Sequence, residues 1–269
     1  MIRLDSRPFW RYVVIGWCMT LAACASLDPL TEKSTSVSGE VVTERFQNDQ
    51  ALRAQGLKHW SVEGSLEIET PEQGRRNRID LLGSGQSRVR MRIHGPFRQI
   101  AAEMIAFEQR VRWVDSEQRT VTEVPATPEG LHYLIGVPID PERLVFWLMG
   151  QADALTMADI LPHDPEGVRV ETRGGERLWL DEGSGRIRAR AGEAAPGSLY
   201  RAIYDWPDPK EHRATAQLMP KSIHVTLDQP KIRMVFTLRG WRLPSAGPVM
   251  ADFDQAVASG FSLFRPLAP

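Results

Sequence analysis

Apolar and polar residues alternate through most of the chain, and the alternation is clearest near residue 60. Every second position there is apolar or glycine, namely Trp60, Val62, Gly64, Leu66 and Ile68. A period of two is the pattern of a β-strand with one buried and one solvated face. Similar segments, separated by turn residues, predict strands at residues 79–82, 89–93, 100–107, 109–114, 119–124, 167–172, 177–181, 186–191, 200–205, 222–228 and 231–239.

Two short helices are predicted to interrupt this pattern. Each begins with a capping side chain followed by proline, in the pairs Thr127-Pro128 and Asp140-Pro141. Proline is favoured at the first helical position because the backbone N–H that it lacks has no partner there. The first helix is expected to end near residue 135 and the second at Gly150, a residue type that commonly terminates helices.

The second helix has an apolar face, because Leu144, Trp147 and Leu148 are spaced i, i+3 and i+4. Another short helix is expected at residues 43–54. Its candidate apolar contacts are Val42, Phe46 and Leu52.

The order of elements is strands, two helices and strands again, and it predicts one mainly β domain. Short consecutive strands joined by tight turns favour antiparallel hairpins over a doubly wound α/β fold. The segment Gly83-Ser84-Gly85 is expected to be one of these turns. We therefore expect a curved antiparallel sheet, or incomplete β-barrel, with the short helices covering its concave face.

The first 24 residues have the pattern of a secretory signal. Arg3, Arg7 and Arg11 form a positive segment, and residues 12–23 are uncharged. That run is shorter than the roughly 20 apolar residues that a spanning helix needs. It ends in Leu21-Ala22-Ala23-Cys24, which resembles the bacterial lipobox, where the cysteine thiol receives a lipid. An ordinary signal peptide with a chance cysteine, or an uncleaved anchor, is the alternative.

Cysteine usage agrees with a lipid anchor. The chain has two cysteines; Cys18 would leave with the signal, and Cys24 would be consumed by acylation. Several acyl chains on one residue suffice for stable membrane attachment. Ala25 stands where an aspartate retains enterobacterial lipoproteins at the inner membrane, so by analogy we expect a periplasm-facing protein of the bacterial outer membrane.

Composition and motifs exclude several classes of function. The formal net charge is −1, without the basic surplus of a nucleic-acid binder. The chain contains no P-loop, no G-x-G-x-x-G motif after a strand and no G-x-S-x-G elbow. None of the six histidines forms a tight ligand motif. We expect no metal, no cofactor and no catalysis, although a dispersed catalytic group, for example Asp80 with Glu103, stays open as an alternative.

Three arginines, Arg88, Arg90 and Arg92, share one face of a predicted strand. One interpretation is an ordinary solvent-exposed face. The other is a basic stripe, continued by Arg98, that faces anionic headgroups or a partner; each such side chain contributes about 1 kcal/mol near an anionic surface.

Several motifs in order resemble the LolB family of outer-membrane lipoprotein receptors over residues 57–243. They are Trp60-Ser61-Val62-Glu63-Gly64, Gly95-Pro96-Phe97, Val137-Pro138-Ile139 followed by Leu144-x-x-Trp147-Leu148-x-Gly150, Pro220-Lys221-Ser222-Ile223, and Trp241. The resemblance implies an incomplete barrel, lidded by helices, whose apolar cavity holds acyl chains. It also implies that a protruding loop with an exposed apolar residue aids insertion of lipoproteins delivered by a periplasmic carrier.

These implications assign residues. The membrane-inserting loop would be Gly95, Pro96 and Phe97, although Phe97 folding back onto the core is an alternative. The cavity would be lined by Trp60, Val62, Leu66, Val89, Met91, Ile93, Met104, Trp113, Leu131, Leu134, Leu144, Trp147 and Leu148. A filled core made of the same residues is the alternative.

The chain departs from the family at two places. Residues 78–82 lack the family's Trp-x-Gln, and the end of the chain extends beyond the usual limit. Phe253, Val257, Phe261 and Leu263 could add a helix and a strand there.

The predicted organisation is a signal peptide (1–23), a lipidated tether with a short helix (24–55), a LolB-like domain (56–243) and an extension (244–269). The predicted function is that of a monomeric outer-membrane lipoprotein that binds acyl chains and inserts lipoproteins. A non-catalytic structural or assembly lipoprotein, using the fold as an interaction platform, is the alternative.

Overall fold

The computed structural model describes residues 38–56, 58–85, 87–152, 155–164, 167–208, 219–243, 253 and 261–264, all within one compact unit. The predicted signal peptide and Cys24 lie outside these residues. So does the helix expected in the C-terminal extension.

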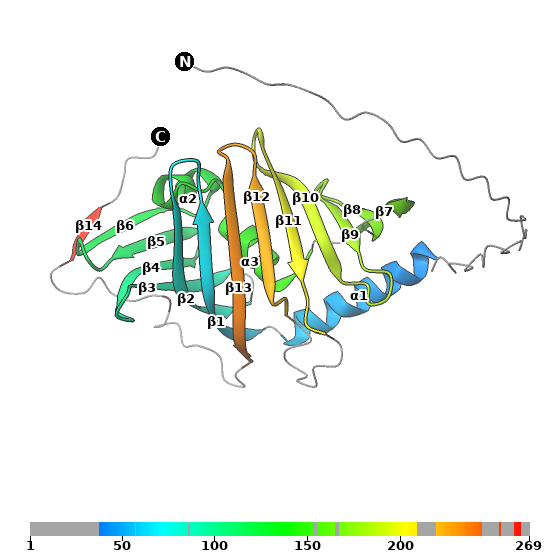
Figure 1. Cartoon of the computed structure of the whole chain (residues 1–269), viewed down its shortest axis with the longest axis horizontal. Coiled ribbons are helices and arrows are strands. Elements are labelled where there is room, and N and C mark those ends of the chain that lie inside the picture. Colours follow the sequence, from blue (N-terminus) through cyan, green and yellow to red (C-terminus); the bar gives the residue numbers. More distant parts are fainter. Residues whose placement is uncertain are drawn as a thin grey trace, which may run out of the picture. The chain divides into compact units, whose positions relative to one another are not determined.

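In the described residues the fold is a single curved sheet of fourteen strands with three helices (Figure 1). Its edges, β14 and β7, do not pair with each other in the described part of the chain, so the sheet stays open. This confirms the predicted mainly β fold with a curved sheet or incomplete barrel. The strands are β1 (His59–Glu69), β2 (Gly74–Ser84), β3 (Arg88–His94), β4 (Ile100–Phe107), β5 (Arg110–Asp115), β6 (Thr120–Pro125), β7 (Leu155–Asp164), β8 (Gly167–Thr172), β9 (Arg177–Leu180), β10 (Ile187–Ala195), β11 (Ser198–Asp205), β12 (Ser222–Leu227), β13 (Ile232–Arg242) and β14 (Ser262–Phe264).

The sheet consists of two antiparallel meanders joined at β1 and β13. One meander runs from β1 to β6 and the other from β13 back to β7. The β1–β13 pairing includes Glu69 opposite Arg233 and Ser61 opposite Arg242. Strand β14 adds to the outer edge of β6 and is parallel to it.

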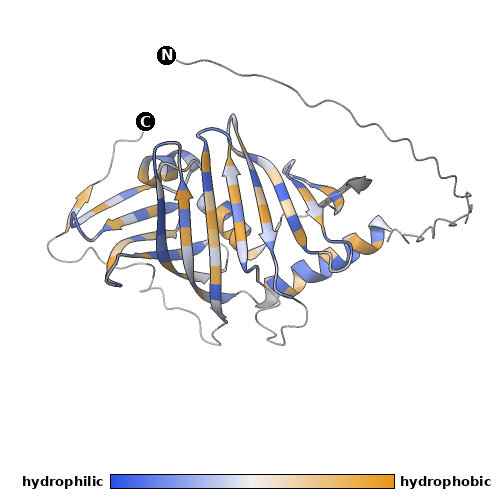
Figure 2. Ribbon diagram, viewed as in Figure 1, coloured by the Kyte–Doolittle hydropathy of each residue, from blue (hydrophilic) through white to orange (hydrophobic). Residues whose placement is uncertain are grey.

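Alternating side chains decide which face of the sheet is buried. In β1, Trp60, Val62 and Leu66 are buried, whereas Glu63 between them is exposed. Figure 2 shows the corresponding alternation of hydrophobic and hydrophilic positions along the strands. The period-two prediction is therefore confirmed for this strand.

Helices α2 (Pro128–Ile135) and α3 (Pro141–Met149) connect β6 to β7, which lies at the far end of the strand order. The hydroxyl of Thr127 accepts a hydrogen bond from Gly130 N, and the carboxylate of Asp140 accepts one from Glu142 N. Gly150 ends α3 in the left-handed conformation. The predicted caps are confirmed, and in Figure 1 both helices lie behind the sheet, on one of its faces.

Helix α1 (Gly39–Gly56) is longer than the predicted segment and buries Val42 and Phe46. The prediction for Leu52 is wrong, because this side chain is 60% exposed. At 3.6 residues per turn, position 53 falls on the same face as Phe46 and position 52 does not. Arg53 therefore takes the buried position. None of the three described helices is long and apolar enough to cross a membrane.

The glycine segment at the end of β2 also differs from its prediction. Gly83 and Ser84 belong to β2, and Gly85, with a φ of 62°, begins the turn. Strand β2 is longer than expected because its polar first half pairs with β1, from Gly74 opposite Glu69 onward. The strand β7 was not predicted, whereas the strand expected in the C-terminal extension is confirmed as β14.

Candidate functional site

A tight turn between β3 and β4 holds Phe97 in solvent. Arg98 N donates to Gly95 O over 3.1 Å, and Gly95 N donates to Gln99 O over 2.9 Å. Arg98 has a left-handed φ of 63°. Phe97 is 90% exposed, the largest value among the exposed large hydrophobic side chains of the described residues.

Gly95 and Gln99 explain why this turn keeps one shape. A Cβ atom on Gly95 would lie 2.6 Å from Gln99 Nε2, so a side chain there would displace the glutamine amide. That amide oxygen accepts a hydrogen bond from Phe97 N over 3.0 Å. The Phe97 N–H thus has its hydrogen-bond partner within the turn. The backbone is held at the surface, and the phenyl ring lies outside the core.

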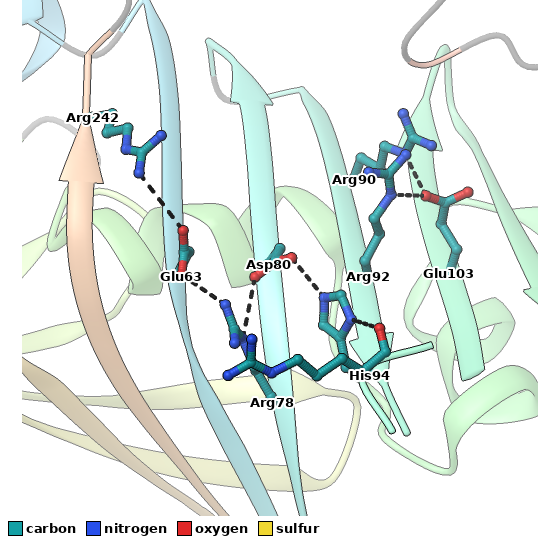
Figure 3. Close-up of polar contacts among 9 residues, drawn as sticks. Glu63, Arg78, Asp80, Arg90, Arg92, His94, Glu103 and Arg242 are labelled. Atoms are coloured by element: carbon teal, nitrogen blue, oxygen red, sulfur yellow. Dashed lines mark hydrogen bonds and ion pairs between the residues drawn. The ribbon is translucent and has the colours of Figure 1, made fainter. Parts of the chain in front are cut away.

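Charged side chains form a continuous chain of contacts on the sheet face opposite the predicted cavity (Figure 3). It starts at Arg242 on β13 and passes through Glu63, Arg78 and Asp80 to His94. Beyond it, Arg90 and Arg92 both donate to Oε1 of Glu103.

The two interpretations of the arginine stripe need correction at Arg90. This residue is 5% exposed, so it is neither a solvated side chain nor available to headgroups. Arg92, with Nε 2.8 Å from Glu103 Oε1, is compensated by the same carboxylate. Cross-strand pairing causes this, since Glu103 on β4 lies opposite Arg92 in the sheet register.

An open groove of about 260 Å³ lies on this charged face, beside the β-bulge of β1 between Ser61 and Glu63. Its lining combines charged side chains with backbone of the central strands. The lining residues are Ser61, Val62, Glu63, Asp80, Leu81, Leu82, Arg90, Arg92, Gly240 and Arg242. The groove thus offers charged side chains beside the apolar residues Val62, Leu81 and Leu82.

The residues predicted to line the cavity are brought together between the sheet and the helices. Ten of them are buried in one core cluster: Trp60, Val62, Leu66, Val89, Met91, Met104, Leu131, Leu144, Trp147 and Leu148. The other three, Ile93, Trp113 and Leu134, are partly buried and pack against that cluster.

A buried polar junction ties α1 to the end of α3, and sequence reasoning did not find it. Gln50 donates to Gly150 O and accepts from Ala152 N, both over 3.1 Å. Arg53 pairs with Asp49 at 2.6 Å and stands over the ring of Trp206 at 4.5 Å. The sequence signal was an arginine on the apolar stripe of α1 with an aspartate four residues before it.

A second buried arginine, Arg190, connects β10 to the same region. It donates to Gln151 O and lies 3.5 Å from Glu176. The hydroxyl of Tyr200 donates to Glu176.

Burial, followed by the charge of Glu176, raises the pKa of Tyr200, and burial raises the pKa of Tyr204. Both tyrosines therefore serve as neutral hydroxyls, and no cluster of three or more metal-ligating side chains occurs among the described residues.

The family comparison covers the part of the chain that holds the Phe97 turn and helices α2 and α3. The family model described as outer membrane lipoprotein LolB matches residues 58–179. The resemblance to the LolB family is confirmed. The match to LolB begins just before β1 and ends in β9, so most of the second meander lies beyond it.

Solved structures show a similar fold over about three quarters or more of the chain. An outer membrane lipoprotein-sorting protein domain from Vibrio parahaemolyticus has a TM-score of 0.52 and 9% identity, covering 81% of this chain and 97% of its own. A LolA superfamily protein from Nitrosomonas europaea has a TM-score of 0.50 and 11% identity, with 75% and 94% covered. A DUF1329 family protein from Desulfovibrio piger has a TM-score of 0.51 and 8% identity, with 78% and 98% covered.

At these identities the structures show the fold alone. No curated protein matches the chain in sequence. The LolB match over residues 58–179 suggests a lipoprotein-binding or lipoprotein-localisation function.

Proposed function

We propose that this protein is a lipid-anchored acceptor that binds the acyl chains of lipoproteins and inserts those lipoproteins into the outer membrane. The observation that carries the proposal is Phe97, 90% exposed on a tightly hydrogen-bonded turn inside the LolB-matched segment. A phenyl ring in water is unfavourable unless an apolar phase receives it, and a bilayer is such a phase.

The acyl site in this proposal is the apolar interface between the sheet and the lid helices. Each Å² of apolar surface removed from water contributes roughly 25 cal/mol, so an acyl chain needs no charged partner there. Ile93, Trp113 and Leu134 are its proposed entrance, because they are the predicted cavity residues that remain partly exposed. Entry requires α2 to move away from β5 and β6, the strands it contacts.

Attachment at Cys24 would keep the acceptor at the membrane, and the partners would be acylated lipoproteins and a periplasmic carrier. No cofactor takes part. The acyl chains move without a covalent step from the carrier to this protein and then to the bilayer, and the burial of their apolar surface drives each move.

The test is transfer of a fluorescently acylated lipoprotein from its periplasmic carrier to proteoliposomes that contain the full chain. We expect Phe97→Ala to accept cargo normally and to insert it about tenfold more slowly, since burial of a phenyl side chain is worth about 1.5–3 kcal/mol. Phe264→Ala on β14, which removes another half-exposed phenylalanine, is the matched control. Absence of transfer by the unmodified protein would refute the acceptor function, and equal insertion by both variants would refute the role of Phe97.

The groove on the charged face favours a second candidate, a non-catalytic assembly platform of the cell envelope. Its mixed lining of charged and apolar side chains, with the exposed Arg242, suits a protein partner. Lipid extraction of the purified protein separates the two candidates, because a carrier retains acyl chains and a platform does not.

A further inference from the structure

The charged face of the sheet is buried over β4 and β6. In β4, Met104 and Ala106 belong to the core cluster, so Ile105 between them lies on the opposite face. Ile105 and Val121 of β6 are each 1% exposed, yet neither belongs to the core cluster. The three described helices bury their apolar side chains in that cluster. Another segment of the molecule is therefore needed to cover the charged face at these strands.

A second buried apolar group also lies outside the core. Phe253, a described residue of the C-terminal extension, is 1% exposed and is among the largest fully buried side chains of the described residues. It belongs to neither of the two core clusters of described residues. A buried phenyl ring packs against several neighbours, and Ile105 and Val121 offer apolar surface that the helices do not cover.

The course of the chain leads the extension across this face. Strand β13 ends at Arg242 and β14 begins at Ser262, and the six strands of the first meander lie between them in the sheet. At about 4.8 Å per strand, the crossing is about 34 Å wide. The connection has nineteen residues, and at about 3.3 Å per residue it spans this width without being fully extended. Helices α2 and α3 lie on the core face, which leaves the charged face for the crossing (Figure 1).

The charged side chains of this face carry a positive surplus. Four arginines of β3 and β5 share two glutamates of β4 and β6. The groups are Arg90 and Arg92 with Glu103 (Figure 3), and Arg110 and Arg112 with Glu123. Among these six side chains, positive charges exceed negative charges by two. Covering such groups is favourable when the cover brings opposite charge with it, so the covering segment should be acidic.

The extension supplies this charge beside its buried phenylalanine. Asp252 and Asp254 are the two acidic residues of the extension, and they flank the phenylalanine in the sequence. In the sheet register, Ile105 lies between Arg90 on β3 and Arg112 on β5. An apolar group between two cations on the sheet is thus matched by an apolar group between two anions in the extension.

We propose that the C-terminal extension is a strap that docks on the charged face of β3–β6, with Phe253 packed against Ile105 and Val121. The two flanking aspartates face the arginines of β3 and β5. The occupant of this face is therefore a segment of the same chain. It lies outside the part matched by the LolB family model, residues 58–179, and the inference does not depend on the acceptor function.

The strap gives the last strands of the first meander support on both faces. On the core face, α2 contacts β5 and β6. At the edge of the sheet, β14 pairs with β6 from Ser262 onward, nine residues after Phe253. Docking of the phenyl ring therefore also holds β14 close to its partner strand. Loss of the ring should loosen β4–β6 and leave the second meander unchanged.

The first measurement is photo-cross-linking in the full chain, held in detergent micelles, with p-benzoylphenylalanine in place of Phe253. We expect cross-links to peptides of β4 and β6, identified by mass spectrometry. The same amino acid in place of Phe97, which is exposed on its turn, should give no cross-link within the chain. Cross-links from position 253 to other elements alone, or no cross-link at all, would overturn the proposal.

The second measurement is hydrogen exchange of the full chain, resolved by peptide. We expect Phe253→Ala to speed exchange in β4–β6 by at least about tenfold, because the burial of a phenyl ring no longer opposes local opening. Exchange in β10–β12 should stay the same. Leu263→Ala, which shortens a half-exposed side chain of β14, is the matched control and should leave both regions unchanged. Unchanged exchange in β4–β6, or equal acceleration throughout the sheet, would contradict local docking.

The charge match is tested by neutralising both aspartates. We expect Asp252→Asn combined with Asp254→Asn to speed exchange in β4–β6 by about fivefold. Glu72→Gln combined with Glu182→Gln changes the net charge equally at two exposed turn residues and should have no effect there. Equal exchange in the two double variants would overturn the pairing of the strap with the arginines. None of these measurements involves lipoprotein transfer, so the strap and the acceptor function are decided independently.

Discussion

Trp60 and Gly83 form a matched pair in the first hairpin of the first meander. They lie opposite each other in β1 and β2, and a Cβ atom on Gly83 would come within 2.0 Å of the Trp60 indole. Trp60 is fully buried and donates from Nε1 to Gly85 O over 3.2 Å. The indole therefore cannot move aside without losing both its packing and its hydrogen bond.

We expect Gly83→Ala to lower the free energy of unfolding by about 1–3 kcal/mol, the usual cost of overpacking a core. Urea unfolding followed by tryptophan fluorescence measures this change. Gly74→Ala is the matched control in the same strand, because its Cβ would have as its nearest neighbour a flexible glutamate methylene 3.7 Å away. Equal losses in the two variants would contradict the account given for Gly83.

Single residues also mark the limits of prediction from the sequence. Phe97 could be placed at the tip of a turn because Gly95-Pro96 is a local signal. The partners of Arg90 and His94 could not be found in the same way, since Glu103 and Asp80 reach them through strand register. Leu52 was assigned to the buried face and Arg53 was not, because a hydrophobic pattern cannot show that an aspartate compensates a buried guanidinium.

Among the elements, hydrogen bonds from α1 hold the C-terminal end of α3 in place. Arg53 is fully buried, pairs with Asp49 and donates to Met149 O over 3.1 Å. The buried Arg53 also lowers the pKa of nearby Arg186, second to the effect of burial itself. Loss of the Arg53 guanidinium leaves Asp49 and the end of α3 with fewer partners.

We expect Arg53→Ala to cost about 3–5 kcal/mol of unfolding free energy, because it breaks a buried ion pair by removing one partner. Thermal and urea unfolding of the full chain are the measurements. Arg45→Ala removes an exposed arginine of the same helix that donates to Glu182 O, and it should cost about 1 kcal/mol. A loss for Arg53→Ala no greater than this would show that the junction is not important for stability.

Elements were predictable to the extent that their signals are local. Helices α2 and α3 begin and end where Thr127, Asp140 and Gly150 indicated. Strand β2 extends beyond its apolar half because β1 supplies partners for its polar residues, and strand β7 was missed. Pairing with a neighbouring strand fixes such boundaries, and the hydrophobic pattern of the strand itself does not contain that information.

For the molecule as a whole, function depends on where the domain is held. The described helices provide no membrane span, and the predicted anchor is the lipid on Cys24. We expect Cys24→Ala to release the protein from membranes into the soluble periplasmic fraction, because one residue carries all the acyl chains. Fractionation with an immunoblot measures the distribution, and continued attachment to membranes would contradict lipidation at this residue.

At this scale the sequence indicated the class of fold and the resemblance to LolB, since the order of strands and helices and the spacing of the motifs extend over long stretches of the chain. The polar groove and the buried arginine junctions could not be predicted, because each combines residues from elements that are distant along the chain.

The joining of the two meanders at β1 and β13 has a consequence for how the protein assembles. Within the first meander, from β1 to β6, neighbouring strands are joined by short turns and can therefore pair rapidly. The β1–β13 seam instead unites residues such as Glu69 and Arg233, which are 164 positions apart. Closing a loop of that length is entropically expensive, and contacts of such separation slow folding. The seam should therefore form late, so that a newly made chain passes through a stage with the edge of β1 open to other strands.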